Sequence, residues 1–78
     1  MLKQYEDELR QAYTEVINEY DPYSDPSEAE TPEEMLYNLR EIRDDIKNSD
    51  DEDMVYLYWH IQSVIGQFEA AGVGRFDA

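Results

Sequence analysis

Residues 54–68 read MVYLYWHIQSVIGQF and form the most apolar stretch of this 78-residue chain. Large apolar side chains recur there at steps of three and four, which places them on one face of an α-helix. The main face consists of Met54, Leu57, Tyr58, Ile61, Val64, Ile65 and Phe68, and Val55 and Trp59 are expected to widen the same arc. We therefore expect a helix whose apolar face is the spine of the fold.

Start and stop signals extend this helix to about residues 50–71. Ser49 and Glu52 have the spacing of a capping box, and the acidic run that begins at residue 50 suits the positive end of the helix dipole. Gly72 fits the left-handed position after a helix, and Val73 is placed to make the accompanying apolar contact. Residues 73–78 are then a short tail.

A second helix is expected upstream, over residues 2–20. No Gly or Pro interrupts it, and it ends before Asp21-Pro22 because a residue that precedes proline is disfavoured in the helical conformation. Its apolar stripe is Leu2, Tyr5, Leu9, Ala12, Tyr13, Val16, Ile17 and Tyr20.

A third helix is expected between these two, over residues 32–47. Residues 31–34, TPEE, combine a capping box with proline at the first helical position. Arg40 and Asp44 stand four residues apart and are expected to form an ion pair. The apolar face of this helix is Met35, Leu36, Leu39, Ile42 and Ile46.

Three helices of comparable length predict an all-α fold, a small antiparallel three-helix bundle that forms one domain over residues 1–78. An acidic loop, residues 21–30, joins the first two helices. The chain has no cysteine, so disulfides contribute nothing. Well-patterned helices must therefore supply the stability of this small domain.

The chain has 20 acidic and 6 basic residues, a net charge of −14. This charge repels phosphate backbones and anionic lipids, so direct binding to nucleic acid or to a membrane is not expected. No segment resembles a membrane span or a signal peptide, and we expect a soluble, cytoplasmic protein. Disorder, which acidic chains often show, is disfavoured by the periodicity of the apolar residues.

The charge is concentrated in one part of the chain. Residues 1–53 hold 18 acids and 5 bases, whereas residues 54–78 hold two acids and one base. Acids on one line of the first helix, followed by those of the loop and of the next helix, predict a continuous negative ridge. Such a ridge would fit a basic groove that binds duplex DNA, which carries one charge per about 1.7 Å. The alternative is a solvated face that only keeps the chain soluble.

Aromatic residues lie within and beside this acidic region. Exposed tyrosines among carboxylates are typical of binding surfaces, and Tyr23 and Tyr37 are expected to have that role. Trp59 would either cover the edge of the bundle or form a dimer contact. Three other tyrosines share the apolar stripe of the first helix and are expected in the core, with the hydroxyl at its rim: Tyr5, Tyr13 and Tyr20.

Nothing in the sequence predicts catalysis, a cofactor or a metal site. His60 is the single histidine, and it shares a helical line with polar residues, so we expect it to be partly exposed. Segments that begin at Asp21 and Asp50 fail the EF-hand pattern, because their sixth positions are Pro26 and Val55 rather than glycine.

These observations predict a non-enzymatic inhibitor that binds a basic, nucleic-acid-binding protein or complex. In size and charge, though in no motif, the chain is similar to small acidic inhibitors, often phage-encoded, of restriction or CRISPR complexes. Two alternatives remain open: an immunity or antitoxin protein that neutralises a basic nuclease, and an adaptor subunit that forms a homodimer through the third helix. The expected contact residues are Glu8, Glu15, Glu19, Asp25, Glu28, Glu30, Glu33, Glu34, Tyr23 and Tyr37.

Overall fold

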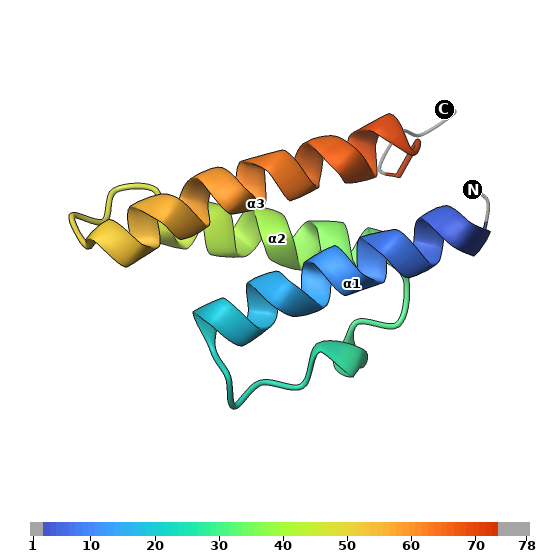
Figure 1. Cartoon of the computed structure of the whole chain (residues 1–78), viewed down its shortest axis with the longest axis horizontal. Coiled ribbons are helices and arrows are strands. Elements are labelled where there is room, and N and C mark those ends of the chain that lie inside the picture. Colours follow the sequence, from blue (N-terminus) through green and yellow to red (C-terminus); the bar gives the residue numbers. More distant parts are fainter. Residues whose placement is uncertain (1–2, 74–78) are drawn as a thin grey trace.

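The computed structural model describes residues 3–73, which form three helices and one short 3-10 turn. The elements are α1 (Lys3–Tyr20), η1 (Pro26–Glu28), α2 (Pro32–Ile46) and α3 (Glu52–Ala70). They pack side by side as a bundle, so the predicted all-α, three-helix fold is confirmed (Figure 1). Within the described part of the chain, no helix combines the length and the apolar character that a membrane crossing requires.

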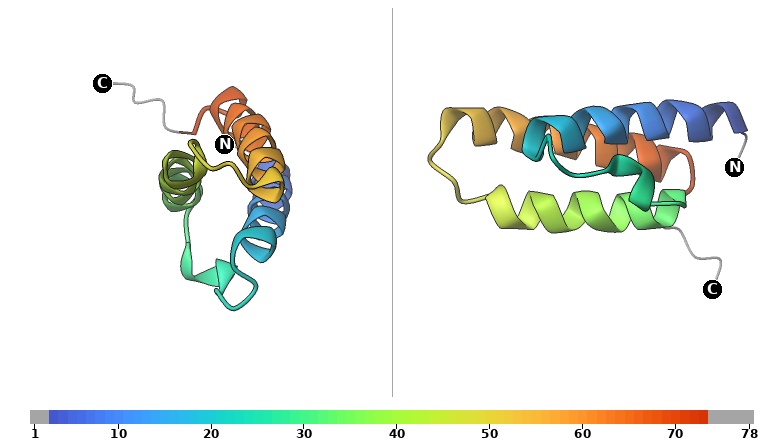
Figure 2. Two further views of the ribbon diagram at one scale, coloured as in Figure 1. Left: turned by 90° about the vertical axis from the view of Figure 1, so that its left-hand side faces the viewer. Right: turned by 90° about the horizontal axis from the view of Figure 1, so that it is seen from below.

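The predicted antiparallel arrangement holds for α3 but is wrong for α1 and α2. Tyr13 bonds Asn38 and Tyr20 bonds Asp45, two contacts with the same offset of 25 residues, so α1 and α2 run the same way. α3 runs antiparallel to both, as Figure 2 shows. Residues 21–31, here called the crossover segment, return the chain from the end of α1 to the start of α2. Eleven extended residues span up to about 36 Å, enough for this return.

One apolar face of each helix forms the core. The positions Val55 and Trp59, which were expected to widen the apolar arc of α3, are instead exposed. They lie on the side of α3 opposite Ile61, and the other two helices cover only one side of it. The buried apolar residues are Leu9, Tyr13, Val16, Ile17, Ala29, Met35, Leu36, Leu39, Ile46, Leu57, Ile61, Val64, Ile65, Phe68 and Val73.

The expected cap of α2 is present. The Thr31 side chain accepts a hydrogen bond from the Glu34 backbone N–H at 3.1 Å, and Pro32 occupies the first turn. The Glu34 carboxylate reaches back to the N–H of Glu30, one residue before the position that a standard capping box uses. Two N–H groups at the start of the helix are thereby satisfied.

Two local predictions were wrong. α3 begins later than expected, because Asp51 caps it by accepting from the Asp53 N–H, while Ser49 accepts only from the N–H of Asp51. Arg40 does not pair with Asp44. It bonds Glu69 of α3 at 3.1 Å, since the neighbouring helix places that carboxylate within reach. Asp44 pairs with Arg43.

The end of α3 agrees with the sequence. Gly72 has a φ of 90°, and its N–H donates to the carbonyl of Glu69. The Val73 N–H donates to the carbonyl of Phe68, which completes a Schellman motif. Val73 is buried. Leu2 and residues 74–78, where the sequence predicted the helix start and most of the tail, lie outside the described residues.

Side-chain bonds hold the crossover segment in place. The Asp21 carboxylate accepts from the Tyr23 N–H and from the hydroxyl of Ser24. At the far end, the Arg10 guanidinium of α1 donates to the carbonyl oxygens of Ala29, at 2.9 Å, and Glu30, at 3.1 Å. The Ala29 side chain is buried against the core. The segment is thus fixed along α1 rather than free.

We expect Arg10→Gln to release this segment, because two carbonyl oxygens lose a charged donor. The free energy of unfolding should fall by about 1–2 kcal/mol, and amide exchange should accelerate over residues 28–31. Arg43→Gln removes the same charge from a partly exposed ion pair with Asp44 and should lower the free energy of unfolding by less than about 1 kcal/mol. Denaturant titration and hydrogen exchange measure both variants. Equal protection of residues 28–31 in the two variants would contradict the role assigned to Arg10.

Candidate partner-binding groove

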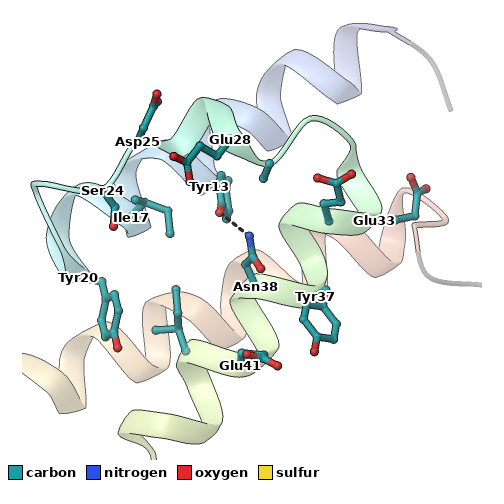
Figure 3. A pocket seen from close by; sticks show the side chains of 13 residues that line it. Tyr13, Ile17, Tyr20, Ser24, Asp25, Glu28, Glu33, Tyr37, Asn38 and Glu41 are labelled. Carbon is teal, nitrogen blue, oxygen red and sulfur yellow. Dashed lines mark hydrogen bonds between the residues drawn. The ribbon is translucent and has the colours of Figure 1, made fainter.

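An open groove of about 610 Å³ lies between α1, the crossover segment and α2. We call it the acidic groove, and Figure 3 shows its lining from close by. Its floor is a contact between the two parallel helices, in which Asn38 Nδ2 donates to Tyr13 Oη at 3.0 Å. The lining residues are Tyr13, Ile17, Tyr20, Ser24, Asp25, Glu28, Ala29, Glu33, Glu34, Tyr37, Asn38, Glu41 and Ile42.

Five exposed carboxylates surround this groove, and none of its described lining residues is basic. Two come from the crossover segment and three from α2, where Glu33 and Glu41 lie on one line with Tyr37 between them. Unpaired carboxylates on one concave surface add their potentials, which raises the local concentration of cations. The five are Asp25, Glu28, Glu33, Glu34 and Glu41.

One of these carboxylates has a fixed position. Asp25 caps η1, and its Oδ1 accepts from the Ser27 hydroxyl at 2.7 Å and from the Ser27 N–H at 2.9 Å. These two hydrogen bonds lower the pKa of Asp25 below its usual value, and the bond from the Ser27 hydroxyl has the larger effect. Because hydrogen bonds to the charged form favour it, Asp25 carries its charge at neutral and mildly acidic pH.

Two tyrosines stand at the rim of the groove. Tyr37 is 63% exposed on α2. Tyr20, at the end of α1, donates its phenol to Asp45 Oδ2 at 3.1 Å. This hydrogen bond, with partial burial and the charges of Asp45 and Asp21, raises the pKa of Tyr20. Of the three tyrosines expected in the core, only Tyr13 is buried, whereas Tyr5 and Tyr20 are exposed.

The predicted ridge is divided into two separate acidic surfaces. At 100° per residue, Glu15 lies on the side of α1 opposite Tyr13 and Ile17, which line the groove. Glu8 and Glu19 share the line of Glu15. All three therefore face away from the acids of the crossover segment and α2.

Glu19 lies on the flank of the molecule next to α3. Glu19 Oε2 lies 3.3 Å from His60 Nδ1, and both residues border a second hollow of about 530 Å³. His60 is partly exposed, as the sequence predicted. The other lining residues of this hollow are Asp53, Met54, Tyr56 and Leu57.

Of the ten predicted contact residues, five line the acidic groove: Asp25, Glu28, Glu33, Glu34 and Tyr37. Tyr23 is 97% exposed outside it, and Glu30 contributes its backbone to the Arg10 contact. The structure adds Tyr20 and Glu41. Glu41 could have been predicted, because Glu33, Tyr37 and Glu41 are four residues apart and so share one face of the helix. Tyr20 could not, because it lines the groove only where the crossover segment returns along α1.

The chemical groups that the groove presents are mainly carboxylates and tyrosine phenols. Within residues 3–73, no three acidic or histidine side chains converge closely enough to hold a metal ion. The carboxylates can pair with cationic groups, and the tyrosine rings can add apolar contact area beside them.

The Tyr20–Asp45 bond should make stability depend on alkaline pH. Because the folded-state pKa of Tyr20 is raised above that of the unfolded chain, the contribution is complete below about pH 10 and is lost as pH rises through the raised value. At pH 7, Tyr20→Phe should lower the free energy of unfolding by less than about 1 kcal/mol, because the bond is solvent-exposed. Denaturant titrations should show the gap closing as the pH rises through the raised pKa of Tyr20. A gap independent of pH would contradict this assignment.

Comparison of the chain with protein-family models, with curated proteins and with solved structures finds no match. Its function must therefore be inferred from its own surface.

Proposed function

We propose that this protein is a small non-enzymatic inhibitor that docks its acidic groove onto a basic, nucleic-acid-binding surface of a partner protein. One observation carries the proposal: five carboxylates and three tyrosines from three segments converge on one groove, with no basic side chain among the described lining residues. A protein surface that binds phosphates presents rows of Lys and Arg. The groove presents the complementary charges.

The negative charge would favour binding both at long range, before the two proteins meet, and in direct contact. The net charge of −14 steers the protein toward a cationic surface and accelerates association at low ionic strength. At contact, a carboxylate can accept two parallel hydrogen bonds from one guanidinium, which favours arginine as a partner residue. Repulsion by the same charge excludes nucleic acid as the direct ligand.

The groove is held in shape before a partner arrives. Glu33 and Glu41 project from a capped helix, and Asp25 is fixed by its two bonds to Ser27. Arg10 attaches the crossover segment to α1. Side chains on ordered backbone lose less conformational freedom on binding, which favours affinity.

The groove is compact, and this supports a local basic patch as its target rather than a long duplex track. Glu33 and Glu41 are about 12 Å apart along α2. The immunity or antitoxin alternative gains support from the same compactness, because such a protein covers a particular surface with a few dominant residues. Tyr37, at the centre of this line, is the side chain best placed for that role.

Charge reversals at two positions test the groove. Glu33→Lys/Glu41→Lys alters the acidic groove, and Glu8→Lys/Glu15→Lys makes the same change in net charge on the far side of α1. Wild type and both variants would be immobilised and exposed to extract of the source cells at low salt, with and without excess duplex DNA. We expect a basic protein to be retained by wild type and by the α1 variant, displaced by DNA, and retained at least about tenfold less by the groove variant.

Each remaining outcome is informative. Equal losses in both variants would mean that net charge alone retains the partner, and loss confined to the α1 variant would assign binding to Glu8 and Glu15. Either result would overturn the groove as the binding surface. Retention that duplex DNA does not affect would overturn competition for a nucleic-acid site and favour the immunity alternative.

A pair of tyrosine truncations tests the same surface without changing charge. We expect Tyr37→Ala to weaken binding of the captured partner by about tenfold, since an aromatic ring at the centre of an interface often dominates affinity. Tyr23→Ala, also an exposed tyrosine but outside the groove, should change the affinity by less than about threefold. Titration calorimetry with the purified partner measures both. Equal effects would show that the partner does not contact the groove centre.

A further inference from the structure

α3 has a second exposed face that the bundle does not use. Residues 54–68 contain no Asp, Glu, Lys or Arg, yet three of their large side chains are exposed: Val55 at 43%, Tyr56 at 73% and Trp59 at 64%. α3 forms one edge of the bundle, so its outer side faces no other described helix (Figure 1). The acidic groove lies elsewhere, since none of its lining residues belongs to α3.

Exposed residues on this outer face follow the spacing of a helix–helix contact. Their positions advance by three, four, three and four residues, the pattern of the a and d sites of a coiled coil. We call this set the outer seam, and it consists of Tyr56, Trp59, Ser63, Gly66 and Ala70. The buried seam of the same helix follows its own pattern with Leu57, Ile61, Val64 and Phe68.

Neither the backbone conformation nor the packing of the described chain requires glycine at position 66. It lies in the interior of α3, where glycine is less favourable than alanine, and its φ is not positive. A Cβ atom added there would meet nothing within 4 Å. The fold of one chain therefore leaves room for a larger residue at this position. A glycine here is explained if the backbone or a large side chain of another molecule approaches it closely.

The charge distribution favours a second copy that lies antiparallel. Two chains of charge −14 repel each other, and the outer seam is the face on which uncharged residues can meet. Parallel pairing would place the acidic runs at residues 50–53 side by side. Antiparallel pairing separates them by about 28 Å, the length of α3.

Large and small residues of the seam match about a two-fold axis. With the axis between Gln62 and Ser63, Trp59 of each copy faces Gly66 of the other, and Val55, an exposed residue that borders the seam, faces Ala70. A two-fold contact requires this reciprocity, in which residue i meets j and j meets i. We propose that the protein forms an antiparallel homodimer through the outer seam of α3, with each Trp59 packed over the Gly66 of the second copy.

The full-length chain tests this by sedimentation equilibrium from about 5 to about 500 µM, in about 0.5 M salt to screen the repulsion. The interface is one helix wide, so it is small and we expect reversible association within this range. The mass should rise from 9.3 kDa toward twice that value. Over the same range, the emission of Trp59, the single tryptophan, should move to shorter wavelength as its ring is buried.

Two variants should weaken the dimer at least about tenfold. Trp59→Ala removes the large side chain, and Gly66→Gln fills the space over Gly66 that the Trp59 ring of the second copy would occupy. Because glutamine is the better helix former, Gly66→Gln should raise the melting temperature of the dilute monomer, so unfolding would not explain the loss. Tyr37→Ala removes a tyrosine of similar exposure from the groove and should leave the dimer unchanged.

A chain that stays monomeric at all these concentrations would overturn the proposal, as would a dimer that survives Gly66→Gln. A dimer broken by Tyr37→Ala would move the interface to the groove. The outcome is independent of the inhibitor proposal, because the groove and the outer seam share no residue.

Discussion

The apolar face of α3 is the surface on which the two acidic helices, α1 and α2, pack despite the repulsion between their charges. α1 and α2 run in the same direction, so their dipoles do not offset each other, and no salt bridge joins them within the described residues. Each hydrogen bond that connects them involves a tyrosine: the Tyr13 hydroxyl accepts from Asn38, and the Tyr20 hydroxyl donates to Asp45. The apolar face of α3, within residues 54–68 that contain no Asp, Glu, Lys or Arg, thus supplies the attraction that their surfaces lack.

The acidic groove is a consequence of this arrangement. Because α2 runs parallel to α1, the connection between them must travel back along their length, and it brings Asp25 and Glu28 beside the acids of α2. Arg10 stabilises this return by bonding backbone carbonyls rather than carboxylates. Arg10 therefore holds the segment without neutralising the side chains that line the groove.

The sequence predicted each helix, because apolar periodicity is a local property, but it did not predict how the helices combine. Residues 21–31 have no periodicity, so nothing local indicates that they reverse the direction of the chain. The continuous ridge was inferred by treating Glu15 and Glu28 as neighbours, whereas they lie on opposite sides of α1. The start of α3 was predicted wrongly because several neighbouring residues can cap a helix. Four consecutive acids follow Ser49, and one of them, Asp51, makes the cap in place of Ser49. At Thr31 the fixed φ of Pro32 leaves a single choice.

The two proposed surfaces would act on each other through charge. A dimer would carry twice the net charge of one chain, −28, and this repulsion opposes association more strongly as ionic strength falls. A basic partner in each groove would neutralise part of that charge without contacting α3, and would thereby favour the dimer. Coupling of this kind is reciprocal, so the dimer must also bind the partner more tightly than the monomer does. Two grooves on one particle would further raise affinity for a target with two basic sites.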